Sequence, residues 1–402
     1  MEQLSLSKCP SCGGDLVPGS VCERCAKRSV FRLVRREILL LMFLSCLAAA
    51  AYFCTRVIAR TNKGMKEKVA ASWFQQGARD LNASRANDAV VAFRRATVND
   101  RTSRVYSLSL ARALQMANHD NEARDLLLQI RESIPENPEV NLELARISAR
   151  QKNTPEALRY YHDALYGIWT GDNAEKQRQE IRRELIEFLI SQNAQQQALA
   201  ETIALAAHLP STIADHLQLA ELFFRVDDFA SALENYRWVA RREPRNQIAL
   251  LGAGEAAFKL GNYAQSKHYL SAVSHRNNKA ENILETSALI MDNDALGPRI
   301  TESERLRRIS KDLNDVAKSV ESCVNRQSNT AAVQPLQGVL DKLRKQSHTV
   351  VISRRNPDPN ILFSSLDLIY DAETALSSSC GPLTVPDTAL LLVAQKSRGM
   401  EP

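Results

Sequence analysis

Apolar residues follow three different patterns along the chain, and each pattern predicts a different element. Residues 38–55 are eighteen positions without a charge, which predicts one long apolar helix. Between residues 70 and 277 small residues recur at a fixed interval, which predicts pairs of closely packed helices. Beyond residue 281 apolar residues such as Leu306, Ile309 and Leu313 follow the spacing of one helical face. Together the patterns predict an all-α protein.

The interval between the small residues is 34 positions, and it holds at two points of the pattern. One set is Ala89, Ala123, Ala157, Ala198 and Ala232, and the other lies twelve positions earlier at Gly77, Ala111, Ala145, Ala220 and Gly254. Helices cross closely only where side chains are small, so the two sets mark the contacts within each helix pair. The interval lengthens by seven residues near 166–172, which separates three units from three more.

Large and rigid residues complete the pattern at set distances from the small ones. They are Trp73, Phe93, Tyr161, Tyr236, Pro135 and Pro244. With them the segment resembles the tetratricopeptide repeat, which implies a helix-pair solenoid of about six units over residues 70–277. The fourth unit departs from the family pattern, since Ile186 and Thr202 replace a small residue and an aromatic. The resemblance implies a surface that binds a protein or peptide.

Four cysteines near the N-terminus have the spacing of a metal site. Cys9, Cys12, Cys22 and Cys25 form two C-x2-C pairs separated by nine residues. Two such knuckles aim four thiolates at one tetrahedral Zn²⁺, in a closed shell without room for substrate. The fragment CPSCGG…CERC resembles a bacterial zinc ribbon, which implies structural zinc within residues 1–30. Two disulfides are the alternative, but short pairs ahead of a retained anchor favour metal.

The apolar run predicts a transmembrane helix over residues 37–59, because its core of about 31 Å is long enough to cross a bilayer. Six basic residues precede it, at Arg24, Lys27, Arg28, Arg32, Arg35 and Arg36, and four follow it, at Arg60, Lys63, Lys66 and Lys68. Basic residues favour the cytosolic side of a membrane, and zinc-binding thiolates are better protected in a reducing compartment. Both observations place the N-terminus in the cytosol of a bacterium and the repeats outside its cytoplasmic membrane. A basic linker is expected over residues 61–69. A cleavage site near residues 48–51 and a lipid-modified Cys46 are the alternatives.

The cysteines beyond this run suggest a disulfide. Only Cys323 and Cys380 occur there, and an oxidising compartment permits them to pair. Two unrelated buried thiols are the alternative. Both cysteines belong to residues 281–402, where the 34-residue interval is lost and we expect a helical C-terminal domain that caps the solenoid.

Composition and motifs argue against catalysis. The net charge of +6 is small and partly juxtamembrane, so contact with lipid head groups is expected and nucleic acid is not. Gly252 and Gly254 imitate a dinucleotide-binding fingerprint, yet they fall inside a repeat helix rather than after a strand. The seven histidines are scattered, and no acid, base or nucleophile constellation is visible. We therefore predict that the protein is not an enzyme.

The resemblance also implies where a partner binds. In such repeats the first helix lines the concave face, and the residue after the small position points into the groove. In this chain those positions are Ala78, Arg112, Arg146, Glu187, Glu221 and Glu255, and Arg150 follows one turn after Arg146. We expect a groove that is basic near the membrane and acidic further away, which would orient an extended ligand. Solvated surface charges are the alternative.

Taken together, the sequence predicts a membrane-anchored interaction scaffold with a cytosolic zinc ribbon. The alternative is transmembrane signalling, in which ligand capture by the repeats alters what the zinc ribbon binds. The sequence assigns neither the partner nor an oligomeric state.

Overall fold

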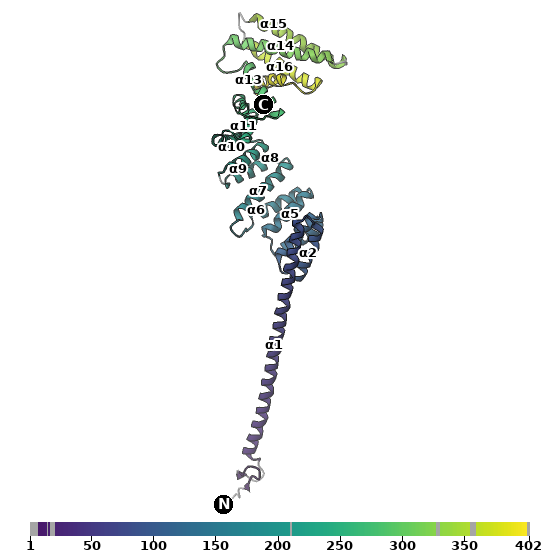
Figure 1. Cartoon of the computed structure of the whole chain (residues 1–402), viewed down its shortest axis with the longest axis vertical. Coiled ribbons are helices and arrows are strands. Elements are labelled where there is room, and N and C mark those ends of the chain that lie inside the picture. Colours follow the sequence, from purple (N-terminus) through teal and green to yellow (C-terminus); the bar gives the residue numbers. More distant parts are fainter. Residues whose placement is uncertain are drawn as a thin grey trace, which may run out of the picture. The chain divides into compact units, whose positions relative to one another are not determined.

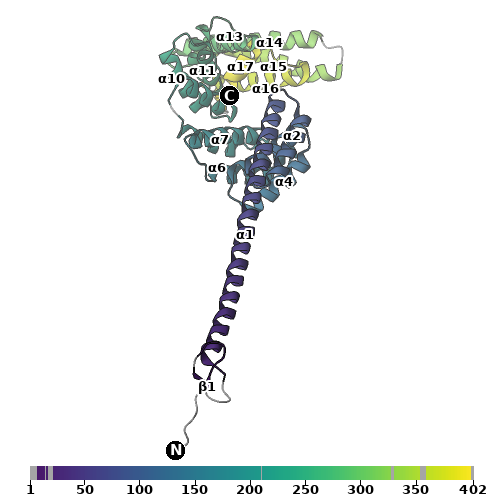
Figure 2. The ribbon, with the colours of Figure 1, turned by 60° about the horizontal axis from the view of Figure 1, so that its bottom comes forward.

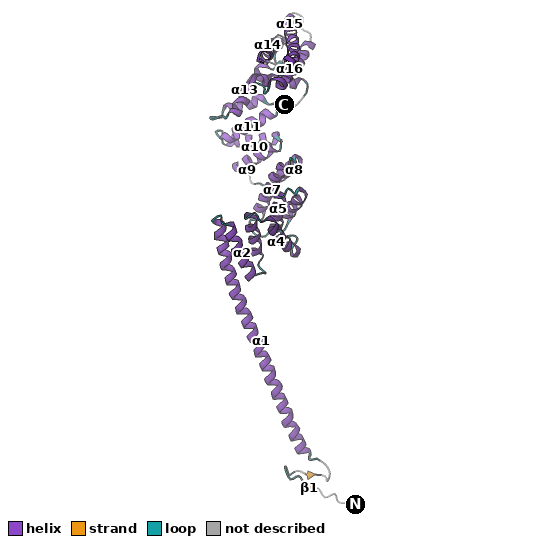
Figure 3. Ribbon diagram, turned by 90° about the vertical axis from the view of Figure 1, so that its right-hand side faces the viewer, coloured by secondary structure: helices purple, strands orange, loops and turns teal. Residues whose placement is uncertain are grey.

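The computed structural model describes residues 7–13, 15–16, 21–209, 211–326, 330–353 and 359–399, and most of them are helical (Figure 3). Two short strands come first, β1 (Ser7–Lys8) and β2 (Asp15–Leu16). They are followed by α1 (Glu23–Asn82), α2 (Ala86–Asn99), α3 (Arg104–Met116), α4 (Asp120–Ser133), α5 (Pro138–Arg150), α6 (Thr154–Tyr166), α7 (Ala174–Ser191), α8 (Gln195–Ala206), α9 (Ile213–Arg225), α10 (Phe229–Arg242), α11 (Gln247–Lys259) and α12 (Tyr263–Ser271). The last five are α13 (Asn278–Asn293), α14 (Glu302–Arg326), α15 (Thr330–Ser353), α16 (Pro359–Cys380) and α17 (Val385–Ser397). The predicted all-α class is confirmed.

Helix α1 is a single element of 60 residues, drawn in Figure 1 as a rod that ends beside α2. It contains the apolar run, residues 61–69 and the first helix of the first repeat. We expected residues 61–69 to be a linker between elements, and the structure makes them helical instead. The physical reason is that they contain no proline and are rich in Lys, Glu and Met, so Gly64 alone costs about 1 kcal/mol.

The small residues of the 34-residue pattern lie at helix contacts. Side chains of Ala89, Ala123, Ala157, Ala198 and Ala232 are each 0% exposed. Gly254 packs so closely on Leu270 that an added Cβ would lie 2.5 Å from the Leu270 Cγ atom. Close helix packing therefore accounts for the glycine at this position, as the repeat pattern predicted, and a dinucleotide-binding turn is not needed to explain it. In the fourth unit Ile186 and Thr202 are 0% exposed, so larger side chains fill the same places.

The turns inside the helix pairs repeat with the same interval. A residue with positive φ follows the first helix of each pair, at Ser84, Asn118, Lys152, Asn193, Asp227 and Gly261. The φ angles lie between 56° and 70°, in the left-handed region that suits Asn, Asp and Gly. The six turns thus share one backbone geometry, and the step of 41 from Lys152 to Asn193 preserves the seven-residue insertion.

The chain divides into two compact units, Met1–Ala164 and Leu165–Pro402. The first contains the N-terminal strands, α1 and the repeats through most of α6. The second contains the repeats from α7 onward together with the C-terminal helices. The division falls next to the predicted insertion at residues 166–172.

The C-terminal helices α14 to α17 share one apolar core, and Figure 2 shows α14, α15 and α16 beside one another. The predicted apolar face of α14 lies in this core, since Leu306, Ile309, Leu313, Val316 and Val320 are at most 5% exposed. Ile290 of α13 belongs to the same core. Helix α13 therefore joins these helices to the last repeats of the second unit.

Candidate metal centre and interaction groove

The four N-terminal cysteines are held by a hairpin and a helix terminus. Strands β1 and β2 pair antiparallel, and Cys9 and Cys12 lie in the turn between them. The amide of Gly13 donates to the carbonyl of Cys9 at 2.9 Å, which closes the turn. Cys22 is the N-cap of α1 and Cys25 lies in its first turn. Only the first pair forms a knuckle, because the second pair begins the helix.

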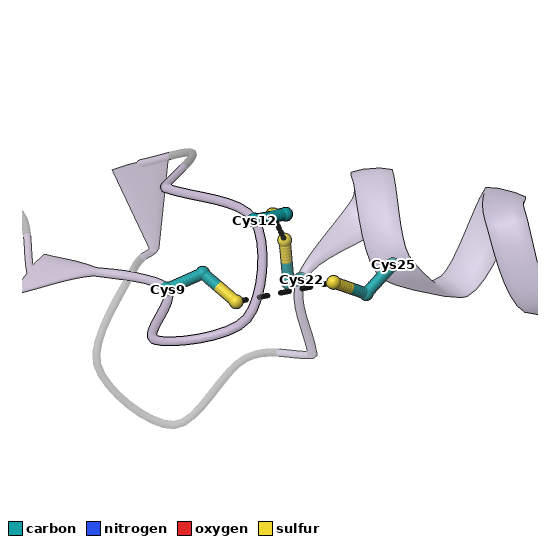
Figure 4. A group of neighbouring side chains, drawn as sticks. All are labelled: Cys9, Cys12, Cys22 and Cys25. Atoms are coloured by element: carbon teal, nitrogen blue, oxygen red, sulfur yellow. Dashed lines mark hydrogen bonds between the residues drawn. The ribbon is translucent and has the colours of Figure 1, made fainter.

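The four sulfur atoms converge on one point, as Figure 4 shows. All four lie within 4.8 Å of one another, with 3.9 Å between Cys9 and Cys25 and 3.4 Å between Cys12 and Cys22. Zinc–sulfur bonds of about 2.3 Å at tetrahedral angles separate neighbouring sulfurs by about 3.8 Å. The donor set therefore fits one tetrahedral metal ion bound by four thiolates.

The pKa values of two of the thiols, Cys22 and Cys25, are shifted in opposite directions. The pKa of Cys22 is lowered to about 7, mainly because the Cys25 amide donates to its sulfur. The pKa of Cys25 is raised to about 12, mainly through thiol hydrogen bonds with Cys12 and Cys9. Neighbouring thiolates repel one another, and a dication at the centre permits all four to ionise.

Helix α1 contains an exposed apolar segment. Within the described residues it is the one helix long and apolar enough to cross a membrane, and none of its most apolar window is buried. Leu41 is 65% exposed and Phe43 is 64% exposed. The length and composition of the segment suit a membrane span or a signal sequence.

In the first compact unit, Met1–Ala164, the predicted groove arginines contact a buried carboxylate. The Arg112 guanidinium lies 2.7 Å from Glu143 and 3.6 Å from Glu139, and Arg146 lies 3.1 Å from the same Glu143 oxygen. The Glu143 side chain is only 2% exposed. Two arginines thus share one buried negative charge between α3 and α5, and this pairing neutralises part of the basic end.

Arg150 is paired as well, with a residue of the preceding helix. Its guanidinium lies 2.7 Å from Asp120 at the start of α4 and donates to the Gln115 side chain at 2.8 Å. Arg150 therefore holds α5 to α3 and α4.

Two of the three predicted groove glutamates of the second unit, Glu187 and Glu255, pair in the same manner. Glu187 accepts two hydrogen bonds from Arg225, of 2.5 and 2.7 Å, which joins α7 to α9. Glu255 lies 2.6 Å from Lys279, which joins α11 to α13. Glu221 is exposed between them. Charges at the groove position thus connect successive repeats.

These partners were not predicted, because they come from other helices. Glu143 follows Arg112 by 31 residues, and Arg225 follows Glu187 by 38. The sequence signal for these ion pairs was an opposite charge about one repeat length away from each predicted groove residue. Five of the predicted groove residues form ion pairs within their own unit, and these are Arg112, Arg146, Arg150, Glu187 and Glu255.

Cys323 and Cys380 are brought together at the ends of α14 and α16. They form a disulfide with a Cα–Cα distance of 6.2 Å. Cys323 is 1% exposed and lies in the core of the C-terminal helices. The cross-link closes a separation of 57 residues.

Two carboxyl groups in the same region were not anticipated. Asp312 and Glu373 are 1% and 0% exposed, and none of their oxygens has a hydrogen-bond partner. Burial raises the pKa of Asp312 to about 8, and burial with the nearby charge of Asp387 raises that of Glu373 to about 9. Both carboxyls are therefore protonated at neutral pH. Asp312 immediately precedes the predicted apolar position Leu313, and only the packing of the neighbouring helices reveals its burial.

Comparison with known proteins supports the repeat fold. Residues 108–173 and 217–279 match the family model of the tetratricopeptide repeat. No curated protein matches the chain. Among solved structures, PilF of Pseudomonas aeruginosa is 18% identical, covers 51% of this chain and 90% of its own, and has a TM-score of 0.39. A tetratricopeptide repeat protein of Parabacteroides merdae is 13% identical, covers 68% and 99%, and has a TM-score of 0.38. The family-model match shows that the chain carries tetratricopeptide repeats, and such repeats indicate a protein-interaction scaffold.

Proposed function

We propose that the protein is a scaffold that captures a protein or peptide in the repeat groove while α1 anchors it in a membrane. The match to tetratricopeptide repeats is the observation that carries this proposal. It is supported by the recurrent helix pairs, whose small residues are buried at the positions that the repeat requires. Binding alone accounts for these features, and the proposal includes no catalytic step.

The proposed topology has the N-terminus in the cytosol and the repeats outside a bacterial cytoplasmic membrane. Three observations support it. The apolar segment of α1 is exposed, so lipid would cover it. Basic residues are more numerous before this segment than after it. The four N-terminal cysteines are arranged as a metal site, whereas Cys323 and Cys380 are joined in a disulfide, which suits a reducing and an oxidising compartment respectively.

We further propose that the metal is Zn²⁺ and that its role is structural. Cys9, Cys12, Cys22 and Cys25 would supply all four ligands, which leaves no open position for a substrate. The ion would supply positive charge that stabilises the thiolates and ties the hairpin to α1. Since Cys22 is also the N-cap of α1, zinc would fix the start of the helix.

Transmembrane signalling is the second candidate, and one observation favours it. Helix α1 begins at the metal ligands and continues without a break into the first repeat. A continuous helix can transmit a tilt or rotation between its ends. A conformational change caused by ligand binding to the repeats would therefore be passed on to the N-terminal hairpin. A cytosolic partner whose binding depends on the repeats would favour this candidate over the scaffold.

Site-specific photo-crosslinking in cells tests the scaffold. A photoreactive residue at Glu221, on a first helix of the second unit, should yield discrete protein adducts. The same residue at Arg237, exposed on the second helix α10, is the matched control and should yield fewer. Equal or absent adducts at both positions would contradict capture by the groove.

A further inference from the structure

A cavity of about 590 Å³ lies where the last repeats meet the C-terminal helices, wholly within the second unit. Phe224 of α9 and Phe258 of α11 line it from the repeats. Ile283 of α13 lines it as well, and Leu383 and Val385 line it from the start of α17. The apolar part of the lining thus combines a repeat surface with a surface from outside the repeats, and polar and charged residues of α11, α13 and α17 complete the walls.

The aromatic wall belongs to the repeat pattern of the second unit. Phe224 and Phe258 are 34 residues apart and each lies in the last turn of a first helix. The equivalent positions of α3, α5 and α7 are Gln115, Ala149 and Ile190. Among these first helices, α9 and α11 thus carry an aromatic ring at this position.

Neighbouring rings hold the two phenylalanines in place. Phe224 makes an edge contact with Phe229 at 5.2 Å between ring centroids, and Phe258 makes one with Tyr263 at 5.5 Å. Both phenylalanines are half-buried, so one face of each is supported and part of each remains open to the cavity. An aromatic side chain entering the cavity would find ring edges and aliphatic groups to pack against.

The charges around the cavity leave one cation without a carboxylate partner among the described residues. Glu255 lies 2.6 Å from Lys279, so these two lining charges compensate one another. Lys259 also lines the cavity and forms no ion pair with any residue of the described chain. Its ammonium group lies 5.8 Å from the ring centroid of Phe229. A ligand with one negative charge beside its apolar part complements this arrangement.

The wall outside the repeats is fixed before any ligand arrives. Cys380, three residues before Leu383, is tied to Cys323 by the disulfide. Thr384 then caps α17, accepting a hydrogen bond from the amide of Asp387, whose carboxylate accepts one from Ser319. A ligand therefore spends little of its binding energy on ordering Leu383 and Val385.

We infer that this cavity binds a peptide segment in which an aromatic side chain stands next to an acidic residue. The aromatic side chain enters between Phe224, Phe258 and Leu383, and the carboxylate meets Lys259. Two walls are first helices of adjacent repeats, so the peptide backbone continues along the proposed groove. The inference rests on the proposed function and specifies the class of partner.

Selection from a random peptide library displayed on phage, with the full-length chain in lipid nanodiscs, tests the inference. Enriched peptides should carry Phe, Tyr or Trp within two positions of Asp or Glu. Their affinity should fall at least tenfold with Phe258→Ala, because a buried aromatic contact is removed. Lys259→Glu should also weaken them about tenfold, and this side chain is exposed, so the fold is retained.

Arg237→Glu is the matched control, since it reverses an exposed charge on α10 away from the cavity, and it should leave affinity unchanged. Peptides that bind both cavity variants as tightly as the wild type would overturn the inference. If Glu221→Arg, at an exposed position predicted to face the groove, weakened those peptides instead, the proposed groove function would stand without this cavity. A library without binders would also overturn the inference, and the crosslinking experiment would then decide separately on the proposed function.

Discussion

The two cysteine-bearing ends of the chain use the same residue in different ways. Near the N-terminus four thiols lie within 4.8 Å of one another on a hairpin and a helix terminus. Near the C-terminus two cysteines are joined in a disulfide beside a helical core. Among the described residues before the apolar segment, Cys9 is the one buried apolar side chain, whereas α14 to α17 bury many.

This difference shows what each cross-link has to do. The N-terminal hairpin has almost no apolar surface to bury, so metal ligation would supply most of its folding free energy. The C-terminal helices have a core that favours folding by itself, and the disulfide adds to it by restricting the unfolded chain. We therefore expect loss of the first cross-link to unfold its region and loss of the second only to weaken its region.

The largest effect is expected from removing the metal. Structural zinc contributes roughly 10–16 kcal/mol in small zinc domains, so Cys9→Ser or a strong chelator should unfold the hairpin. Protease cleavage near residue 16 should become rapid, and the bound zinc measured by atomic absorption should be lost. Melting of the repeats should not change. A hairpin that resists protease without metal would break the comparison.

Loss of the disulfide should have a smaller effect. The double variant Cys323→Ser, Cys380→Ser should lower the free energy of unfolding of the C-terminal helices by about 4 kcal/mol, because the 57-residue loop gains entropy when unfolded. Urea unfolding without reductant measures this loss, and reduction of the wild type should reproduce it. Equal stability of the variant and the wild type would show that the pair is not bridged.

The buried carboxyl of Glu373 should make the C-terminal region sensitive to pH. Its pKa is raised from 4.5 to about 9, so between these values the folded state holds a proton that the unfolded chain releases. Stability therefore falls as the pH rises through this window. Glu373→Gln should stabilise the protein by about 5 kcal/mol at pH 8 and by about 1 kcal/mol at pH 5. Glu285→Gln, at an exposed position of α13, is the control and should show no such dependence.

The smallest effect is expected for the two cysteines that belong to neither region. Cys46 and Cys54 are exposed on α1 and are free thiols. Cys46→Ser with Cys54→Ser should change the melting temperature and the zinc content negligibly, since surface substitutions alter stability by about 0.5 kcal/mol or less. This variant also serves as the control for the other two cysteine experiments. A loss of zinc would mean that the metal site extends beyond the four ligands.

Patterns within one helix or one turn predicted much of this structure. The interval of 34 residues identified Ala89, Ala123 and Ala157, which are fully buried. The C-x2-C spacing identified the four thiols that converge. Both succeed because the physical requirement, a small side chain at a crossing or a ligand in a tight turn, is local.

Contacts between distant elements were not predictable in the same way. Nothing near Arg112 indicates that Glu143 would pair with it, because the pairing depends on how α3 and α5 align. The burial of Glu373 and the cavity beside Phe258 likewise arise where separate helices meet. The length of α1 was missed for another reason, since a basic segment without proline suits a helix as well as a linker.

Protease accessibility in bacterial spheroplasts tests the central claim, a scaffold that spans the membrane with its repeats outside, most directly. The full-length chain would carry one epitope tag before residue 1 and another after residue 402. Protease added outside should remove the C-terminal tag and digest the repeats, while the N-terminal tag survives until detergent is added. Survival of the C-terminal tag with loss of the N-terminal one, or equal digestion of both, would contradict the account.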